Sequence, residues 1–392
     1  MTPATPTRAD ALSTSARSTS SANEPARRRS LAWLCGSLFG PSLTAQAQVA
    51  ILDGLSRRIE QIKAISPALL NELKVPGMSL ALLQQGQIAW SGEFGVCEAG
   101  APETVQANTV FEAASMSKPL FAYLVMQTVQ AGLLDLDRPV QQYLPQEAFK
   151  PPQAWQSLIT ARHLLTHRSG LPNWRSAADE TSQSLRIGSE PGQHFNYSGE
   201  GYFYLQRVLE QICAQPLQTL AESQLFKPLG MRHSSFVLTP ELDALRARGH
   251  DDQGQVLPLQ AYTSANAAYT FYTTAGDYAK FLAAMMSLEP STPHGLKSPA
   301  LKAMLAHATP ATDREPIARP GAAQGLGVYW GLGWAINTTV QGDIAYHTGT
   351  NSTGFRCYSQ FSPSRRSGFV LMSNGLNGHL LWRRLMDLLG DL

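Results

Sequence analysis

The chain has 392 residues, of which 43% are hydrophobic and 15% are charged, and its formal net charge is +2. This length and apolar content allow a large buried core, either as one big domain or as a core domain with an insertion. The net charge is too small for a nucleic-acid surface, and no zinc-ligand spacing or basic stripe with interleaved aromatics occurs, so nucleic acid is excluded as a partner.

The first 47 residues differ in character from the rest of the chain. Residues 1–26 are rich in Ser, Thr, Ala and Pro and show little apolar periodicity, which predicts disorder. A positive cluster, a short apolar stretch and the small-residue signal Ala45-Gln46-Ala47 then follow in the order of an export leader. We therefore expect an exported protein, periplasmic or secreted, with no membrane span in its mature chain. A mobile basic tail on a cytoplasmic enzyme is the alternative.

Residues 48–392 are expected to form one domain with strands at both ends. Apolar spacing predicts a helix over 52–65, and two apolar runs around a polar turn predict a hairpin over 78–90. A mostly apolar helix is predicted over 117–132, and a mainly helical region follows within about 140–320. Three strands are predicted over 342–349, 354–361 and 367–374, and a last helix over 378–389. This order predicts an α+β fold in which both chain ends build one sheet and the helical region is inserted.

The residues Ser115-Met116-Ser117-Lys118 begin the predicted helix over 117–132 and allow two interpretations. Residues i and i+3 share a helix face, so the Lys118 amine can reach the Ser115 hydroxyl, and a lysine can serve as its base if burial lowers the lysine pKa. In the alternative, Ser115 caps the helix and Lys118 is a solvated residue of the first turn. The stretch alone does not decide between them.

Two later stretches, FNYSGEGY at 195–202 and YHTGT at 346–350, extend the pattern. The order Ser-x-x-Lys, Tyr-Ser-x, His-Thr-Gly resembles the serine β-lactamase and penicillin-binding protein superfamily, specifically its class C branch. That branch includes class C β-lactamases, D,D-carboxypeptidases, D-aminopeptidases and β-lactamase-like esterases. The resemblance implies a β-lactamase/transpeptidase-like fold, in which an antiparallel sheet is flanked by helices, and it covers about residues 50–390.

The resemblance implies a role for each matching residue. Ser115 would attack a carbonyl and form an acyl-enzyme, Lys118 would take part in proton transfer, and Tyr197 would deprotonate Ser115 and then protonate the leaving group. The backbone N–H groups of Ser115 and Thr350 would form the oxyanion hole. Without the other motifs, Tyr197 would be read as a core tyrosine.

The third motif and two departures bear on the substrate. The resemblance assigns His347, Thr348, Gly349 and Gly199 to the substrate-binding site. His347 and Thr348 would help to position Tyr197 or a substrate carboxylate, although a lone histidine near a strand end is usually structural. Many relatives carry asparagine where this chain has Gly199, and class C β-lactamases carry lysine where it has His347. These departures leave acyl transfer intact but disfavour efficient β-lactam hydrolysis.

The expected activity is hydrolysis of a small-molecule or peptide substrate, of which cell-wall fragments are one source, with no metal and no cofactor. A D,D-carboxypeptidase or D-amino-acid peptidase is favoured because of His347. The alternatives are a carboxylesterase or weak class C β-lactamase, and a non-catalytic penicillin-binding-like module.

Several other residues are open to a functional and a structural interpretation. His163 and His167 lie four residues apart, but HLLTH lacks the glutamate of a zinc-binding HExxH motif, so the pair is interpreted as structural. Trp174, Trp330 and Trp334 can line a cleft or lie in the core. The cysteines, Cys35, Cys97, Cys213 and Cys357, match no metal motif or disulfide framework, and whether the last three form a bridge stays open.

Overall fold

A computed structural model describes residues 45–144, 149, 153–177, 185–290, 292–313 and 326–389. The segment from Leu52 onward forms one compact unit, and everything below concerns that unit. The disorder predicted for residues 1–26, and the basic and apolar parts of the predicted leader, lie outside the described residues. The small-residue signal of that leader coincides with the start of a helix at Ala45.

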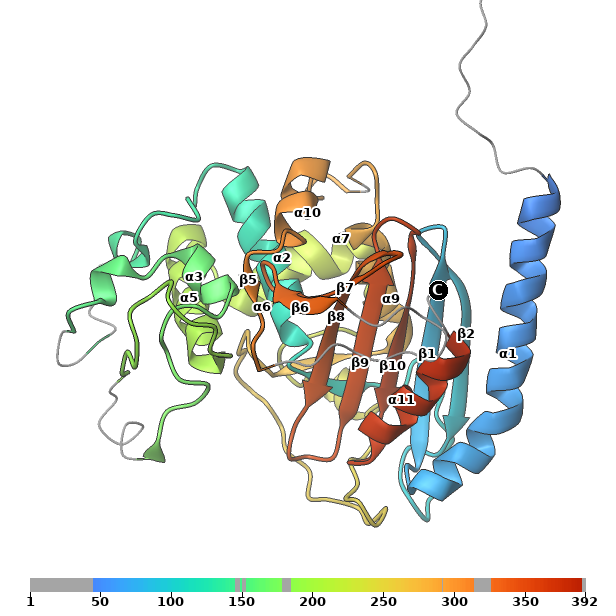
Figure 1. Cartoon of the computed structure of the whole chain (residues 1–392). Coiled ribbons are helices and arrows are strands. Elements are labelled where there is room, and N and C mark those ends of the chain that lie inside the picture. The colour runs from blue at the N-terminus through green and yellow to red at the C-terminus, as the bar shows by residue number, and fades with distance from the viewer. Residues whose placement is uncertain are drawn as a thin grey trace, which may run out of the picture. The chain divides into compact units, whose positions relative to one another are not determined.

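One antiparallel sheet of eight strands organises the unit (Figure 1). Its strand order is β2-β1-β10-β9-β8-β7-β6-β5. The strands are β1 (Gly77–Gln84), β2 (Gln87–Gly95), β5 (Thr309–Pro310), β6 (Gly327–Trp330), β7 (Ala335–Thr339), β8 (Gly342–Thr350), β9 (Arg356–Ser362) and β10 (Ser367–Ser373). Because β1 pairs directly with β10, strands from the beginning and the end of the unit are neighbours in one sheet, as predicted.

Helices and short helical turns lie between the strands along the described part of the chain. The α-helices are α1 (Ala45–Leu73), α2 (Ser117–Gln130), α3 (Ala161–Leu165), α5 (Gly199–Cys213), α6 (Leu217–Ala221), α7 (Lys227–Leu229), α8 (Pro240–Asp243), α9 (Ala275–Met285), α10 (Ser298–Met304) and α11 (Gly378–Leu389). Two 3₁₀ turns, η1 (Val140–Gln142) and η2 (Gln156–Leu158), and one π-helical turn, η3 (Glu222–Phe226), complete the set. The predicted helices over 52–65, 117–132 and 378–389 correspond to α1, α2 and α11.

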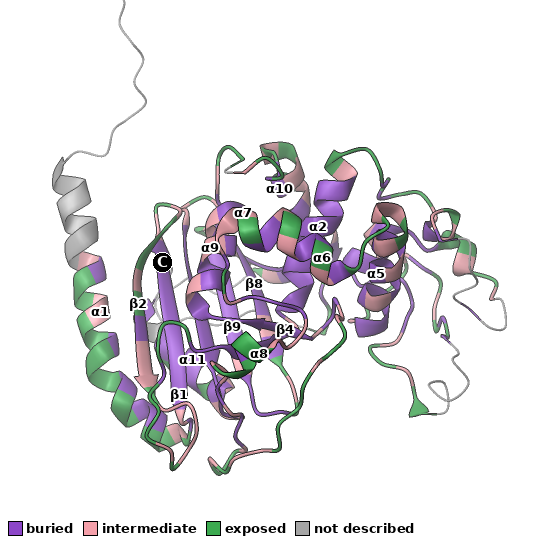
Figure 2. Cartoon of the chain, turned by 180° about the vertical axis from the view of Figure 1, so that it is seen from behind, coloured by how far each residue is buried: buried purple, intermediate pink, exposed green. Residues whose placement is uncertain are grey.

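The sheet is covered on both faces, which explains why its strands β1, β9 and β10 are buried at nearly every position. Leu80 and Leu82 of β1 pack into the cluster that holds α1 and α11, whereas Ala81 and Leu83 pack into the cluster that holds α2, α5 and α9. Successive side chains of a strand point to opposite faces, so a strand covered on both sides has no polar face. Figure 2 shows these strands as buried almost throughout.

The region predicted as mainly helical also contains strand and sheet-covering elements. β4 (Phe271–Thr273) pairs with β3 (Phe111–Ala114) in a separate two-stranded sheet, and β5 forms the last strand of the main sheet. α9 packs against β1, β2 and β10. The short β3–β4 sheet matters most for function, because β3 ends one residue before Ser115.

Candidate active site

Ser115 lies in a sharp turn between β3 and α2. Ala114, the residue before it, has a φ of 46°, in the left-handed region that costs energy for a residue with a side chain. α2 begins at Ser117, its N-cap residue is Met116, and no side chain caps it. Ser117 Oγ donates instead to the Ala114 carbonyl at 2.6 Å. Ser115 is therefore not the helix cap, and that alternative is wrong.

Lys118 is completely buried and points back to Ser115. Its Nζ donates to Ser115 Oγ at 3.3 Å and to the carbonyl oxygen of Ala268 at 2.8 Å. The same atom lies 4.7 Å from the centroid of the Tyr197 ring and 5.6 Å from that of Tyr202. A buried amine requires hydrogen-bond partners, and these contacts supply them. The interpretation of Lys118 as a solvated first-turn residue is therefore wrong.

Tyr197 lies just before α5, at the same cleft as Ser115. Ser198 caps α5, because its Oγ accepts a hydrogen bond from the Gly201 N–H at 2.8 Å. Tyr202 and Tyr204, further along the helix, are the buried core tyrosines, whereas Tyr197 is only half-buried. The helix start thus separates one tyrosine at the cleft from two in the core.

The end of β8 packs directly on β3. A Cβ built on Gly349 would lie 2.2 Å from the carbonyl oxygen of Ala113, so only glycine permits this approach. Thr348 and Thr350, on either side of Gly349, line the cleft together with Ser115. The contact between the two strands therefore brings the backbone of residue 350 to the same cleft as the serine turn.

His347 lies behind the cleft and does not line it. Its side chain is buried, with Nδ1 2.8 Å from the carbonyl oxygen of Thr348. Its ring centroid is 6.4 Å from that of Tyr197 and 5.6 Å from that of Trp330. The structure thus places His347 in the core beside Tyr197 and Trp330.

The cleft itself has a volume of about 870 Å³. Beyond the predicted residues, its lining includes Asn173, Arg175, Glu200, Tyr262, Tyr269 and Asn351. Arg175 and Glu200 form an ion pair, with Arg175 Nε 3.0 Å from Glu200 Oε2. Glu200 lies within the FNYSGEGY stretch, whereas the others come from separate segments, and the sequence alone does not show that they meet. Of the three tryptophans considered, Trp174 lines the cleft, while Trp330 and Trp334 are buried.

Gly199 is explained by its neighbour Trp174. A Cβ on Gly199 would lie 2.4 Å from Cη2 of the indole, so any side chain there would displace the ring. The Gly199 N–H donates to Asn173 Oδ1 at 3.0 Å, which holds the Trp174 loop against the start of α5. Trp174 also meets Tyr269 edge-on, with ring centroids 5.3 Å apart. An aromatic wall therefore occupies the space of the asparagine found in many relatives.

Glu112 ties the loop after β8 to β3. Its Oε2 accepts hydrogen bonds from Thr353 Oγ1 at 2.6 Å and from Asn351 Nδ2 at 2.8 Å. Arg246 Nη1 lies 3.6 Å from Oε1. Burial raises the pKa of Glu112 to about 7, because desolvation of the carboxylate outweighs these partners. Sequence reasoning missed this residue, since a glutamate three residues before a serine carries no distinctive pattern.

The remaining predictions on metals, membranes and cysteines can be stated for the described residues. None of their His, Cys, Asp and Glu side chains form a cluster of three or more that could hold a metal ion. No helix among them combines the length and apolar character that a membrane span needs. Cys97, Cys213 and Cys357 are free thiols, and Cys35 lies outside the described part of the chain.

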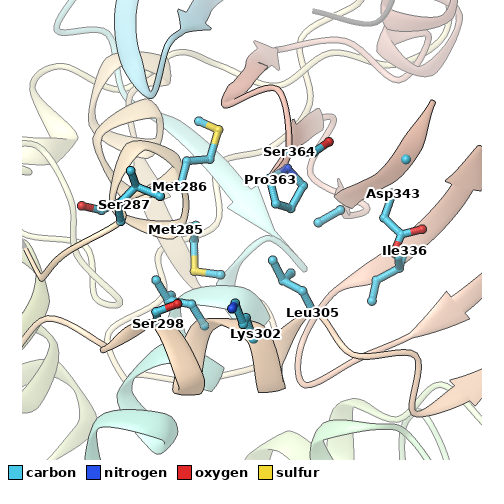
Figure 3. Close-up of a pocket in the computed structure, with 14 residues that line it drawn as sticks. Met285, Met286, Ser287, Ser298, Lys302, Leu305, Ile336, Asp343, Pro363 and Ser364 are labelled. Atoms are coloured by element: carbon cyan, nitrogen blue, oxygen red, sulfur yellow. The ribbon is translucent and has the colours of Figure 1, made fainter. Parts of the chain in front are cut away.

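A second pocket, of about 390 Å³, lies between α9, α10 and the main sheet (Figure 3). Its lining is mostly apolar and includes Met285, Met286, Leu305, Ile336 and Pro363. None of the predicted site residues belongs to it. The chemistry-bearing residues thus gather at the cleft of Ser115.

A comparison with protein families decides which family this arrangement represents. The family model for beta-lactamase matches residues 55–389, nearly the whole described unit. The chain belongs to the beta-lactamase family. This confirms the resemblance inferred from the three motifs.

Relatives within the beta-lactamase family are distant. The chain is 28% identical over 224 residues to esterase EstB of Burkholderia gladioli, which covers 51% of this chain and 57% of the esterase. It therefore spans little more than half of that relative's length.

Two solved structures support the fold. The chain is similar to the D-alanine carboxypeptidase AmpC from Burkholderia cenocepacia, with a TM-score of 0.67 and 22% identity over 88% of this chain and 100% of that one. It is also similar to the octameric penicillin-binding protein homologue from Pyrococcus abyssi, with a TM-score of 0.72 and 21% identity over 85% and 78%. At these identities the likeness concerns the fold, and it confirms the predicted β-lactamase-like architecture.

Proposed function

We propose that the protein is a serine hydrolase that forms an acyl-enzyme at Ser115. The observation that carries the proposal is the completely buried Lys118 amine, 3.3 Å from Ser115 Oγ, beside a cleft large enough for a substrate. Because burial disfavours a charged amine, a buried lysine is suited to exchange a proton with a neighbouring hydroxyl. A non-catalytic binding module has no need of this arrangement.

The reaction proceeds in two halves. Ser115 Oγ attacks the substrate carbonyl carbon while Tyr197 and Lys118 take up its proton, and the resulting oxyanion is stabilised by the N–H groups of Ser115 and Thr350. The tetrahedral intermediate collapses, the leaving group departs with the proton, and an acyl-serine remains. Water then attacks the acyl carbon by the reverse proton path, which releases the acid and restores Ser115.

The cleft favours esters with a neutral, flat acyl group. Among the described residues that line it, Arg175 is the only cation, and Glu200 already pairs with it. Next to Gly199 the cleft presents the indole of Trp174. Many relatives have an asparagine at this position, whose side-chain amide would bind the substrate. The similarity to esterase EstB agrees with this substrate class.

A D,D-carboxypeptidase or D-amino-acid peptidase is the second candidate, favoured by the residue type of His347. Cell-wall peptides would then be the natural substrates. His347 is buried and is not among the residues that line the cleft, so we place this candidate after the ester. Weak β-lactam hydrolysis is expected in either case.

The first prediction concerns the nucleophile and its proton partner. Ser115→Ala should abolish labelling by a fluorescent fluorophosphonate, and Lys118→Ala should slow acylation by a p-nitrophenyl ester by roughly 100-fold or more, because each removes a reacting group. Gel fluorescence and stopped-flow absorbance measure the two effects. Equal labelling of the native protein and Ser115→Ala would overturn the nucleophile assignment.

The substrate class is tested by one panel of p-nitrophenyl esters, D-Ala-D-Ala peptides, D-amino-acid amides and nitrocefin. The ester proposal expects the highest kcat/KM for the esters. Turnover of the peptides above that of the esters would favour the second candidate instead. Export stays a prediction, and N-terminal sequencing of the protein from its native cells would test it.

A further inference from the structure

His167, the second histidine of HLLTH, holds the residues on both sides of Tyr197. Its carbonyl oxygen accepts a hydrogen bond from the Asn196 N–H at 2.7 Å. Its Nδ1 accepts another from the Ser198 N–H at 3.0 Å. One buried residue thus binds the N–H groups of the two residues that flank the tyrosine.

The imidazole also supports the phenol directly. The ring centroids of His167 and Tyr197 are 4.3 Å apart, with the planes tilted by 37°. Tyr202 and Trp330 enclose the imidazole further, at 5.1 and 4.8 Å. With neighbours on several sides, the imidazole forms a fixed surface beneath the tyrosine ring.

The backbone of His167 adopts the left-handed conformation just after a helix. α3 ends at Leu165 with Thr166 as its C-cap, and His167 follows with a φ of 56°. Glycine or asparagine best suits such a left-handed position after a helix, and other residues adopt it at a cost of about 1 kcal/mol or more. Here this left-handed backbone places a histidine side chain in the core.

The hydrogen bond from the Ser198 N–H also defines the protonation state of the His167 imidazole. Because Nδ1 accepts from an N–H group, it carries no proton, and the proton of the neutral imidazole is on Nε2. A doubly protonated ring has no acceptor to offer there. The Tyr197 segment is thus held by the neutral imidazole.

We infer that His167 is a positioning residue for Tyr197, which it aligns with Ser115 and Lys118 through its Nδ1 acceptor and its ring face. The inference rests on the proposed catalytic role of Tyr197. It gives the HLLTH motif a function without a metal. His163, the other histidine of the motif, contacts the carbonyl oxygen of Leu158 instead and takes no part.

The test compares His167→Gly, His167→Asn and the control His163→Asn in the full chain. Glycine suits the backbone but removes both the acceptor and the ring, whereas asparagine suits the backbone and retains an acceptor. His167→Gly should lower kcat for a p-nitrophenyl ester by roughly 100-fold with KM changed little, because a misplaced proton acceptor affects the transition state. His167→Asn should recover at least about tenfold of this loss, and His163→Asn should retain the kcat of the wild type.

A double-mutant cycle separates this inference from the proposed function. In a Tyr197→Phe background, His167→Gly should add little further loss, because the group that it positions is already gone. Thermal unfolding by circular dichroism fixes a temperature at which every variant is folded. A wild-type kcat for His167→Gly, or an undiminished extra loss in the Tyr197→Phe background, would overturn the inference. A fully active Tyr197→Phe would instead overturn the proposed role of Tyr197.

Discussion

The pairing of Gly199 with Trp174 shows how one small residue can change a specificity. The missing side chain at 199 lets the indole cover the start of α5, and Trp174, which is 46% exposed, lines the cleft. An aromatic surface binds flat apolar groups by burial and stacking, whereas an amide binds by hydrogen bonds. We therefore propose that the exchange of one for the other favours apolar acyl esters over amides.

This predicts a specific pattern for substitutions of the two residues. Trp174→Ala should lower kcat/KM for p-nitrophenyl phenylacetate by roughly tenfold relative to the acetate ester, because the stacking surface is lost. Gly199→Ala should have a similar effect, since its Cβ displaces the indole. Steady-state kinetics on both esters measures the ratio.

The matched control is the double variant. Once Trp174 is alanine, Gly199→Ala has nothing to displace and should cause no further change. Additive losses in the double variant would show that Gly199 acts independently of the indole.

The contact between β8 and β3 determines whether two distant strands can share one site. Ser115 follows β3 and Thr350 ends β8, so the two proposed oxyanion donors stay in place only while these strands touch. Gly349 is the residue at the contact point.

Gly349→Ala is therefore expected to separate the strands. The new Cβ would meet the Ala113 carbonyl at 2.2 Å, and a shift of about 1 Å in an oxyanion donor should lower kcat by roughly 100-fold. Gly327→Ala on β6 is the control, because its Cβ would meet only an ordinary contact at 3.6 Å. Equal kcat values for the two variants would contradict the role of the contact.

Some elements were predictable from the sequence and others were not, for identifiable reasons. The hairpin of β1 and β2 has two apolar runs around a Gly-containing turn, a local pattern that needs no partner. β6 and β7 escape prediction because they are short and of mixed polarity, and they become strands only through their neighbours. Likewise, the order of motifs predicted Ser115, Lys118 and Tyr197 as neighbours, but only the folded chain shows Trp174 over Gly199.

At the scale of the whole molecule, Glu112 links parts that are far apart in the chain. β3, the loop after β8 and the segment of Arg246 all meet at its carboxylate. Burial raises its pKa to about 7, above the ordinary value of about 4.5. A carboxyl whose pKa is raised on folding stabilises the protein most below its unfolded pKa, and this contribution is lost as pH rises through the folded pKa.

The free energy of unfolding should therefore carry a contribution from Glu112 that falls by about 3 kcal/mol between pH 4.5 and about 7.5. Glu112→Gln removes the titrating group and should abolish this part of the pH dependence. Urea unfolding at several pH values measures it. Glu60→Gln on α1 is the surface control, and an unchanged slope in Glu112→Gln would refute the assignment.

The pairing of β1 with β10 also has a consequence for how the protein is made. Leu80 pairs with Leu371, so β1 cannot join β10 until the chain has been synthesised beyond residue 371. Pairings between such distant segments form slowly, because closing a long loop costs conformational entropy before any stabilising contact has formed. The residues of the Ser115 turn and Tyr197 are synthesised early. The sheet beside them is complete only after the last strands have been synthesised.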